Sequence, residues 1–156
     1  MCGIFGIVSE KSIAVDRLRV LASHARQRGR DSSGLMVSSQ DGYDVYRADY
    51  DISRLLKNRR IEDSTVVMGH SRLITNGQSD NQPVVRDGVC LLHNGIIVNV
   101  EEVWSQLSLP RQLEIDSEAI VGVALQHLSD GGPLSTVVDK ILAMCRGTMS
   151  CVLVFP

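Results

Sequence analysis

The sequence predicts an α+β protein whose sheet is mainly antiparallel, and three observations lead to this class. Short apolar runs of strand length dominate the first two-thirds of the chain, whereas helical spacing dominates the last third. Turn residues join the strand-like runs, and strands do not alternate strictly with helices, which favours α+β over a parallel arrangement. A length of 156 residues, with 44% hydrophobic and 22% charged residues, predicts one globular domain over residues 1–156.

Apolar runs in the first half of the chain predict four strands and two helices. The strands are expected at residues 3–8, 35–37, 43–46 and 65–70. A helix is expected at 13–27, where apolar residues recur every three or four positions after a Ser12 cap, and a shorter one at 52–56. The Asp41-Gly42 turn predicts that the second and third strands form a hairpin. The stretch 28–34 is rich in turn residues and too polar for a core.

The second half predicts two further strands and three helices. The strands are expected at residues 89–93 and 149–155, and the helices at 100–107, 117–128 and 134–142. Gly131-Gly132-Pro133 separates the last two helices. A polar loop over 75–83 precedes the first of these strands. Loops of this length in compact domains are often functional.

Charge and cysteine content exclude several classes of function. The net charge is −2, with 16 basic and 18 acidic residues, so nothing predicts binding of nucleic acid. The four cysteines lack the close paired spacing of a zinc site and are too few for a secreted disulfide scaffold. The N-terminus does not resemble a signal peptide, and no apolar run approaches the ~20 residues that span a membrane. A reducing cytoplasm fits this pattern.

Cys2 lies one residue from the start of the sequence, in M-C-G-I-F-G-I-V. Removal of Met1 would place a thiol and a free α-amine on one residue. Only a few per cent of an ordinary thiol is ionised at neutral pH, whereas an α-amine, with a pKa of ~7.7–8.0, is partly neutral and can accept the thiol proton. Cys2 is therefore a candidate nucleophile that carries its own base. The alternative is a small buried residue that opens a strand.

Polar segments end or interrupt several predicted strands, and together they resemble a known family. The segments are C-G-I-F-G at 2–6, R-G-R-D-S-S-G at 28–34, G-H-S-R-L-I-T-N-G at 69–77, Q-P at 82–83, H-N-G-I-I at 93–97 and D-S-E at 116–118. In this order they resemble the class II glutamine amidotransferase domain, whose members are N-terminal-nucleophile hydrolases. The resemblance extends from residue 2 to about residue 130.

The resemblance implies an αββα sandwich, in which two mainly antiparallel sheets face each other between helical layers. The family domain normally continues through further strands, so the chain is either a compact variant or a sandwich that is incomplete at the C-terminus because that portion lies elsewhere. The resemblance also implies an enzyme that hydrolyses the side-chain amide of L-glutamine through a γ-glutamyl thioester on Cys2. No metal or other cofactor is expected. The released ammonia implies a separate synthase that accepts it.

The resemblance assigns the oxyanion hole to Asn94 and Gly95. The Asn94 amide and the Gly95 backbone N–H would both donate to the charge that develops on the attacked carbonyl oxygen. Asn-Gly is also the preferred pair of a type I′ turn, so a hairpin turn is the alternative interpretation.

Three further residues are implied to bind the substrate. Arg72, with Thr75 nearby, would hold the α-carboxylate of glutamine, a task suited to a bidentate guanidinium. A surface ion pair is the alternative for Arg72. Asp116 would hold the α-ammonium group, and its alternative is an N-cap of the helix that follows.

Arg28, Asp31 and His70 are expected to support the site. Arg28 and Asp31 would brace it through hydrogen bonds, or only stabilise their own turn. His70 and His93 are expected to be structural, because in the family the α-amine acts as the base.

The ammonia acceptor is left open by the sequence. Leu73 follows the clamp arginine as in the asparagine-synthetase branch, whereas residues 93–99 look more like the branch of sugar aminotransferases such as glucosamine-6-phosphate synthase.

Two other functions compete with glutamine hydrolysis. One is cleavage of another amide by an N-terminal cysteine, and the other is a degenerate domain that binds or regulates a partner.

Overall fold

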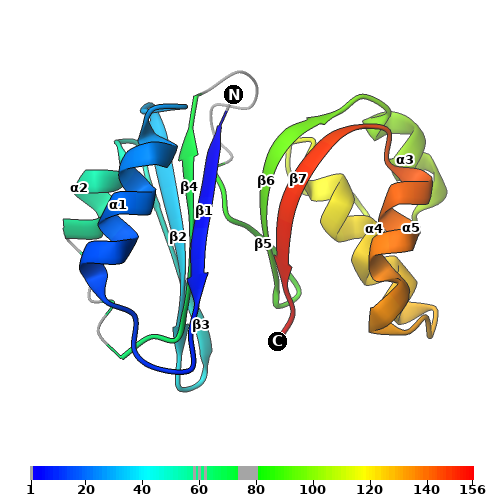
Figure 1. The fold of residues 1–156 in the computed structure, drawn as a ribbon. Helices are drawn as coiled ribbons and strands as arrows, with labels where there is room; N and C mark the ends of the chain where they lie inside the picture. The colour runs from blue at the N-terminus through cyan, green and yellow to red at the C-terminus, as the bar shows by residue number, and fades with distance from the viewer. Residues whose placement is uncertain (1, 58, 60, 62, 74–80) are drawn as a thin grey trace.

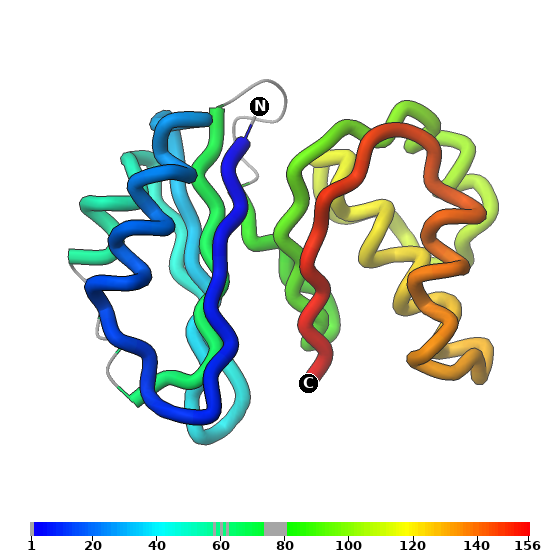
Figure 2. The backbone as a smooth tube through the Cα atoms, viewed as in Figure 1, coloured from blue at the N-terminus to red at the C-terminus, as the bar shows by residue number. Residues whose placement is uncertain are grey.

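The computed structural model of the chain has four layers, in which two β-sheets lie between two groups of helices (Figure 1). It describes residues 2–57, 59, 61, 63–73 and 81–156. The first sheet and its helices come from the chain up to Arg72, and the second sheet and its helices come from the chain from Val84 onward (Figure 2). The αββα sandwich that the resemblance implied is thereby confirmed.

The first sheet contains four antiparallel strands in the order β1-β4-β2-β3. Its strands are β1 (Gly3–Val8), β2 (Ser32–Ser39), β3 (Gly42–Ala48) and β4 (Val66–Arg72). Helices α1 (Val15–Arg26) and α2 (Ile52–Lys57) cover its outer face (Figure 1). Their apolar sides pack against the sheet around Leu18, Leu35, Ile52, Leu55 and Val67. Burial of this apolar surface is the main force that holds the two layers together.

The second sheet contains three antiparallel strands in the order β5-β6-β7. Its strands are β5 (Val84–Arg86), β6 (Val89–Ile97) and β7 (Gly147–Val154). Its helical cover consists of α3 (Val100–Gln106), α4 (Glu118–Ser129), the 3₁₀ helix η1 (Leu134–Thr136) and α5 (Val137–Met144). Leu91, Val103, Ile120, Ala124 and Ile141 form the core between these helices and the sheet.

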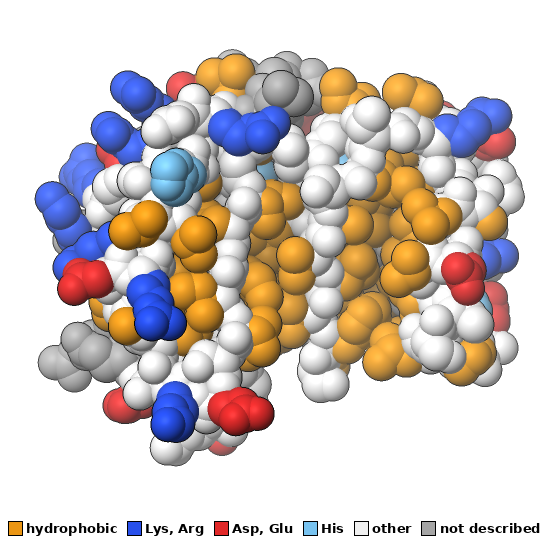
Figure 3. Space-filling model, in the orientation of Figure 1, with side chains coloured by type: hydrophobic (Ala, Val, Ile, Leu, Met, Phe, Trp, Pro, Cys, Tyr) orange, Lys and Arg blue, Asp and Glu red, His pale blue; other side chains and the backbone are white. Residues whose placement is uncertain are grey.

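A smaller apolar cluster joins the two sheets. Met36, Cys90 and Leu92 are buried at its centre, and Ile4 and Val154 pack against them. Burial raises the pKa of the Cys90 thiol to about 12, so this cysteine is an apolar packing residue and not a nucleophile. Apolar side chains of this interior remain visible between the edge strands β1 and β7 (Figure 3).

Most predicted elements are confirmed, and the corrections concern their ends. Ser12 does not cap the first helix, which begins at Val15 after Ala14 and has no side-chain cap. The stretch 28–34 is not excluded from the core, because β2 already begins at Ser32 and is buried there. Strand β5 was not expected, and the last predicted helix begins with the separate turn η1. Within the described ranges, no helix has the length and apolarity needed to cross a bilayer.

Candidate active site

Four of the predicted site residues line one narrow cleft at the end of the sandwich where β1 begins. Cys2, Arg72, Gly95 and Asp116 all contribute to its wall, and the remaining lining residues are Gln82, His93, Ile96, Ile115 and Ser117. The four residues come from positions far apart in the sequence, so the fold brings them together. Thr75 lies outside the described residues.

Cys2 is half-buried and precedes β1, the edge strand of the first sheet. Its backbone nitrogen donates a hydrogen bond to Oδ1 of Asn94 at 3.1 Å, and its Sγ lies 3.8 Å from the carbonyl oxygen of Leu73. Because Oδ1 of Asn94 accepts the bond from Cys2, the amide Nδ2 is the end of Asn94 that can donate. Cys2 and Asn94 are thus joined across the two sheets.

The hydrogen bonds of β6 determine where the Gly95 N–H points. In an antiparallel pair, alternate residues direct their N–H groups away from the partner strand. The His93 N–H donates to Gln82 Oε1 and the Ile97 N–H donates to Asp116 Oδ2, and both point away from β7. The Val98 N–H points in the opposite direction and donates to the Arg146 carbonyl. The Gly95 N–H therefore points to the same side of β6 as the N–H groups of His93 and Ile97. Its N–H points into the cleft between those two occupied donors.

This geometry excludes the hairpin turn as the interpretation of Asn94-Gly95. Both residues lie within β6, opposite Ser150 and Met149 of β7, so they do not form a hairpin turn. A Cβ atom on Gly95 would lie 1.8 Å from the Thr148 carbonyl oxygen and 2.7 Å from His93 Nε2. Glycine is required at this position because the neighbouring strand approaches so closely.

Arg72 is the last residue of β4 and is 5% exposed. Its Nη1 donates to Asn81 Oδ1 at 3.4 Å, and Asn81 in turn donates to Asp49 at 2.7 Å. An arginine this deeply buried is not a solvated surface residue, so the surface ion-pair interpretation is wrong. Its guanidinium faces the cleft that also contains Cys2 and Asp116.

Asp116 does not act as a side-chain cap of α4. The residue at the N-cap position is Ser117, which has no side-chain capping bond. The Asp116 carboxylate instead accepts the Ile97 N–H through Oδ2 at 2.8 Å. This bond fixes the carboxylate at the edge of β6, two residues beyond the Gly95 N–H.

A buried polar network beneath the cleft includes residues that the sequence did not single out as functional. The Gln82 side chain pairs with both backbone groups of His93, accepting its N–H at 2.6 Å and donating to its carbonyl at 2.8 Å. His93 Nδ1 lies 2.8 Å from Ser117 Oγ, and His70 Nε2 lies 3.2 Å from the His93 carbonyl oxygen. For Gln82 and Ser117, the residues of this network that were not named beforehand, the sequence signals were the Gln-Pro pair and the D-S-E segment.

Both buried histidines are held in the neutral form. Burial lowers the pKa of His70 to about 4, with a further lowering by the nearby Arg72 guanidinium. Burial also lowers the pKa of His93, although Asp116 acts in the opposite direction. Neutral His70 donates through Nε2 to the His93 carbonyl, which links β4 to β6. These contacts support the structural role that we expected for both side chains.

The shift at His70 predicts a loss of stability in mild acid. An unfolded histidine takes up a proton near pH 6.5, whereas folded His70 does so only near pH 4. The free energy of unfolding should therefore fall as the pH drops from about 6.5 to about 4, by about 3 kcal/mol from this residue. A His70→Gln variant should show a flatter pH dependence in chemical denaturation. A His24→Gln variant, changed at an exposed position, should keep the wild-type slope, and an equal flattening in both would contradict the prediction.

The turn at residues 28–31 packs against the end of β4. The Asp31 N–H donates to the Arg72 carbonyl at 3.0 Å, and Ser71 Oγ donates to the Gly29 carbonyl at 2.6 Å. A Cβ atom on Gly29 would lie 2.3 Å from the Leu73 nitrogen, so the two segments are in direct backbone contact. Arg28 lines a second cavity beside Cys2 and Asn94. The bracing hypothesis for Arg28 and Asp31 is consistent with this packing.

Within the part of the chain that the structure describes, no group of three or more His, Cys, Asp or Glu side chains could hold a metal ion.

The chain is similar in sequence to glutamine–fructose-6-phosphate aminotransferases. It is 28% identical over 160 residues to the protein from Helicobacter pylori, covering 95% of this chain and 26% of that protein. It is 30% identical over 167 residues to the protein from Photorhabdus laumondii, covering 98% of this chain and 26% of that protein. The chain thus spans about a quarter of the length of these curated relatives. No protein-family model matches it.

Solved structures of amidotransferases share the fold. The glutamine phosphoribosylpyrophosphate amidotransferase of B. subtilis superimposes with a TM-score of 0.78 at 22% identity, over 99% of this chain and 35% of that one. A predicted glutamine amidotransferase from Pseudomonas aeruginosa gives a TM-score of 0.60 at 17% identity, over 98% of this chain and 69% of that one.

The fold is the one that these solved glutamine amidotransferases have. The chain is a homologue of the glutamine–fructose-6-phosphate aminotransferases, and the resemblance inferred from the motifs is confirmed.

Proposed function

We propose that this chain hydrolyses the side-chain amide of L-glutamine to glutamate and ammonia. The observation that carries the proposal is the lining of one cleft. Cys2, Gly95, the buried Arg72 and the carboxylate of Asp116 all contribute to it. The similarity to relatives whose names include glutamine also supports the proposal.

The two charged side chains match the two charged ends of a free amino acid. Arg72 would pair with the α-carboxylate and Asp116 with the α-ammonium group. Each contact would be a charge-assisted hydrogen bond in a partly desolvated cleft, which is stronger than a neutral one. An amide inside a peptide chain lacks these charges at its α-carbon. The pairing therefore favours free glutamine over another amide, which was the first competing hypothesis.

The proposed reaction begins after removal of Met1, when Cys2 carries a free α-amine. The amine takes the thiol proton, and the thiolate attacks the side-chain carbonyl carbon of glutamine. Nδ2 of Asn94 and the Gly95 N–H donate to the resulting oxyanion. The C–N bond then breaks as the ammonium group of Cys2 returns its proton to the departing ammonia. A water molecule, deprotonated by the same amine, hydrolyses the γ-glutamyl thioester and releases glutamate.

The ammonia is proposed to serve a separate acceptor enzyme or domain. The relatives named as fructose-6-phosphate aminotransferases are about four times as long as this chain, so a segment beyond the shared region is where an acceptor activity would lie. We propose that the chain acts as one domain in the cytoplasm, where reducing conditions keep Cys2 as a thiol. The alternative of a degenerate binding domain is not favoured, because the cleft retains its charged residues.

The proposal is tested by intact mass measurement after incubation with a glutamine analogue that carries an electrophilic diazoketone in place of the amide. We expect loss of Met1 and one adduct, mapped to Cys2. A Cys151→Ser variant is the matched control, because Cys151 is exposed whereas Cys90 and Cys145 are buried, and its replacement should leave the adduct in place. A protein that has lost Met1 and releases no ammonia from glutamine, with no adduct at Cys2, would contradict the proposed function.

A further inference from the structure

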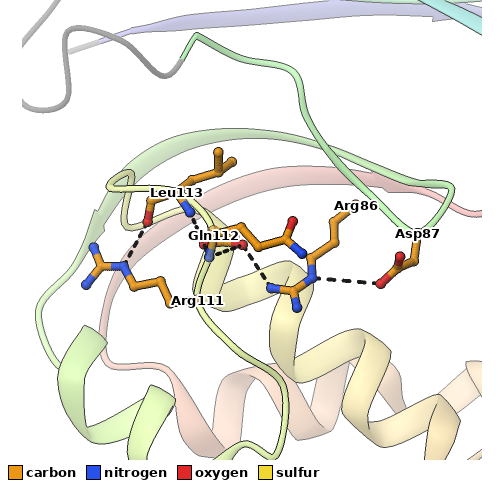
Figure 4. A network of polar contacts seen from close by, with 6 residues as sticks. Arg86, Asp87, Arg111, Gln112 and Leu113 are labelled. Atoms are coloured by element: carbon orange, nitrogen blue, oxygen red, sulfur yellow. Dashed lines mark hydrogen bonds and ion pairs between the residues drawn. The ribbon is translucent and has the colours of Figure 1, made fainter.

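A buried ion pair lies behind the cleft and has no role in the proposed reaction. Arg86 of β5 places Nη1 2.8 Å from Oε1 of Glu118, the first residue of α4. The two side chains are 3% and 0% exposed. The Arg86 guanidinium also lies over the Trp104 ring, 5.8 Å from its centre, and Asp87 lies 3.8 Å from its Nε. Figure 4 shows Arg86 with Asp87 and with the neighbouring residues Gln112 and Leu113.

The Glu118 carboxylate holds the segment that leads into α4. Its Oε2 accepts the backbone N–H of Leu113 at 2.8 Å, its Oε1 accepts from Arg86 at 2.8 Å, and the Gln112 N–H is shared between both oxygens at 3.1 Å (Figure 4). The carboxylate therefore closes a loop from Gln112 back to the start of the helix. All of its hydrogen bonds go to partners from β5 and from this loop.

Asp116 lies inside that closed loop, two residues before Glu118. Its carboxylate is held at the other side by the Ile97 N–H of β6. The Asp116 carboxylate is held by the Ile97 N–H and by Ser117 Oγ at 3.4 Å, and the loop closure made by Glu118 and Arg86 holds the backbone that carries it. The ion pair does not line the cleft, so it acts there through the loop that carries Asp116 together with Ile115 and Ser117.

We propose that Arg86 and Glu118 form a positioning pair that aims Asp116 at the α-ammonium group of the substrate, and so set the selectivity for amino acids over amides that lack the amine. This inference rests on the proposed function. Buried ion pairs are weak contributors to stability, because desolvation offsets much of the attraction. Both oxygens of the Glu118 carboxylate accept hydrogen bonds, and such a buried acceptor holds one arrangement of the groups around it.

The experiment compares two substrates, L-glutamine and 4-carbamoylbutanoate, which has the same amide and carboxylate but no α-amine. The ratio of their kcat/KM values measures recognition of the ammonium group. In an Arg86→Met/Glu118→Leu variant, which replaces the pair by apolar residues of similar size, this ratio should fall at least ~10-fold, the scale of one charge-assisted hydrogen bond. Hydrolysis of 4-carbamoylbutanoate should change much less, because that substrate makes no contact with Asp116.

Two further variants separate positioning from a general loss of stability. Arg86→Lys keeps the charge and should retain most of the wild-type ratio. Ile141→Val weakens the same core without touching the pair, and should leave the ratio unchanged. A double variant that is folded and loses activity equally on both substrates would overturn the inference alone. A matured wild type that hydrolyses neither substrate would overturn the proposed function and this inference with it.

Discussion

Blocking the α-amine of Cys2 is expected to slow glutamine hydrolysis by ~10²–10⁴-fold, the usual contribution of a general base. The described contacts offer the thiol no other base. His70 and His93 are buried and neutral, and their ring nitrogens contact the His93 carbonyl, Ser117 and Thr148. The Cys2 nitrogen, in contrast, belongs to the same residue as the thiol and is oriented by Asn94 Oδ1 at 3.1 Å. An amine at this position can keep that bond and still accept a proton.

The measurement uses two proteins that differ by one residue. Both carry a cleavable N-terminal tag, and cleavage leaves either Cys2 itself or one extra glycine before it. Ammonia release should be fast only in the first protein, while thermal unfolding of the two should coincide. Equal rates would show that another group removes the thiol proton. The proposed role of the α-amine would then be wrong, even if Cys2 remained the nucleophile.

The residue types of the cleft could be recognised in the sequence because the proposed hydrolysis of glutamine requires them. A thiol near the N-terminus, an arginine after a strand, an Asn-Gly pair and an acidic residue before a helix each had a competing structural interpretation. The fold settles three of these by placement. Arg72 is buried, Asn94 and Gly95 lie inside β6, and Asp116 binds the sheet and does not cap α4.

What the sequence did not reveal depends on contacts between distant segments. Strand β5 has only three residues, too few for a visible pattern, and it exists because it pairs with β6 and places Arg86 against Glu118. Ser33 reads as a turn residue, yet it is buried in β2 because its hydroxyl donates to the Tyr50 carbonyl at 2.6 Å. Period and propensity describe neighbours along the chain, whereas the burial of Ser33 and the contact of Arg86 with Glu118 arise from partners 17 or more residues away.

An Asn94→Asp variant is expected to lose ~10²–10³-fold in kcat, the usual effect of removing one oxyanion donor. Aspartate has nearly the same shape as asparagine, and its carboxylate can still accept the hydrogen bond from the Cys2 nitrogen. Only the Nδ2 donor is lost, and a negative charge now faces the developing oxyanion. The KM for glutamine should change little, because the proposed ground-state contacts are those of Arg72 and Asp116. Steady-state ammonia release measures both constants.

The donor role separates from the anchoring role when this variant is compared with Asn94→Ala. Alanine removes the acceptor for Cys2 as well as the donor, so the Cys2 nitrogen loses its hydrogen bond to β6. If Asn94 acts through its donor, the two variants should be similarly slow, with the same adduct site at Cys2. If it acts mainly by holding Cys2, aspartate should be nearly as active as the wild type and only alanine should be slow. That second pattern would leave the Gly95 N–H as the sole oxyanion donor and would refute the paired oxyanion hole.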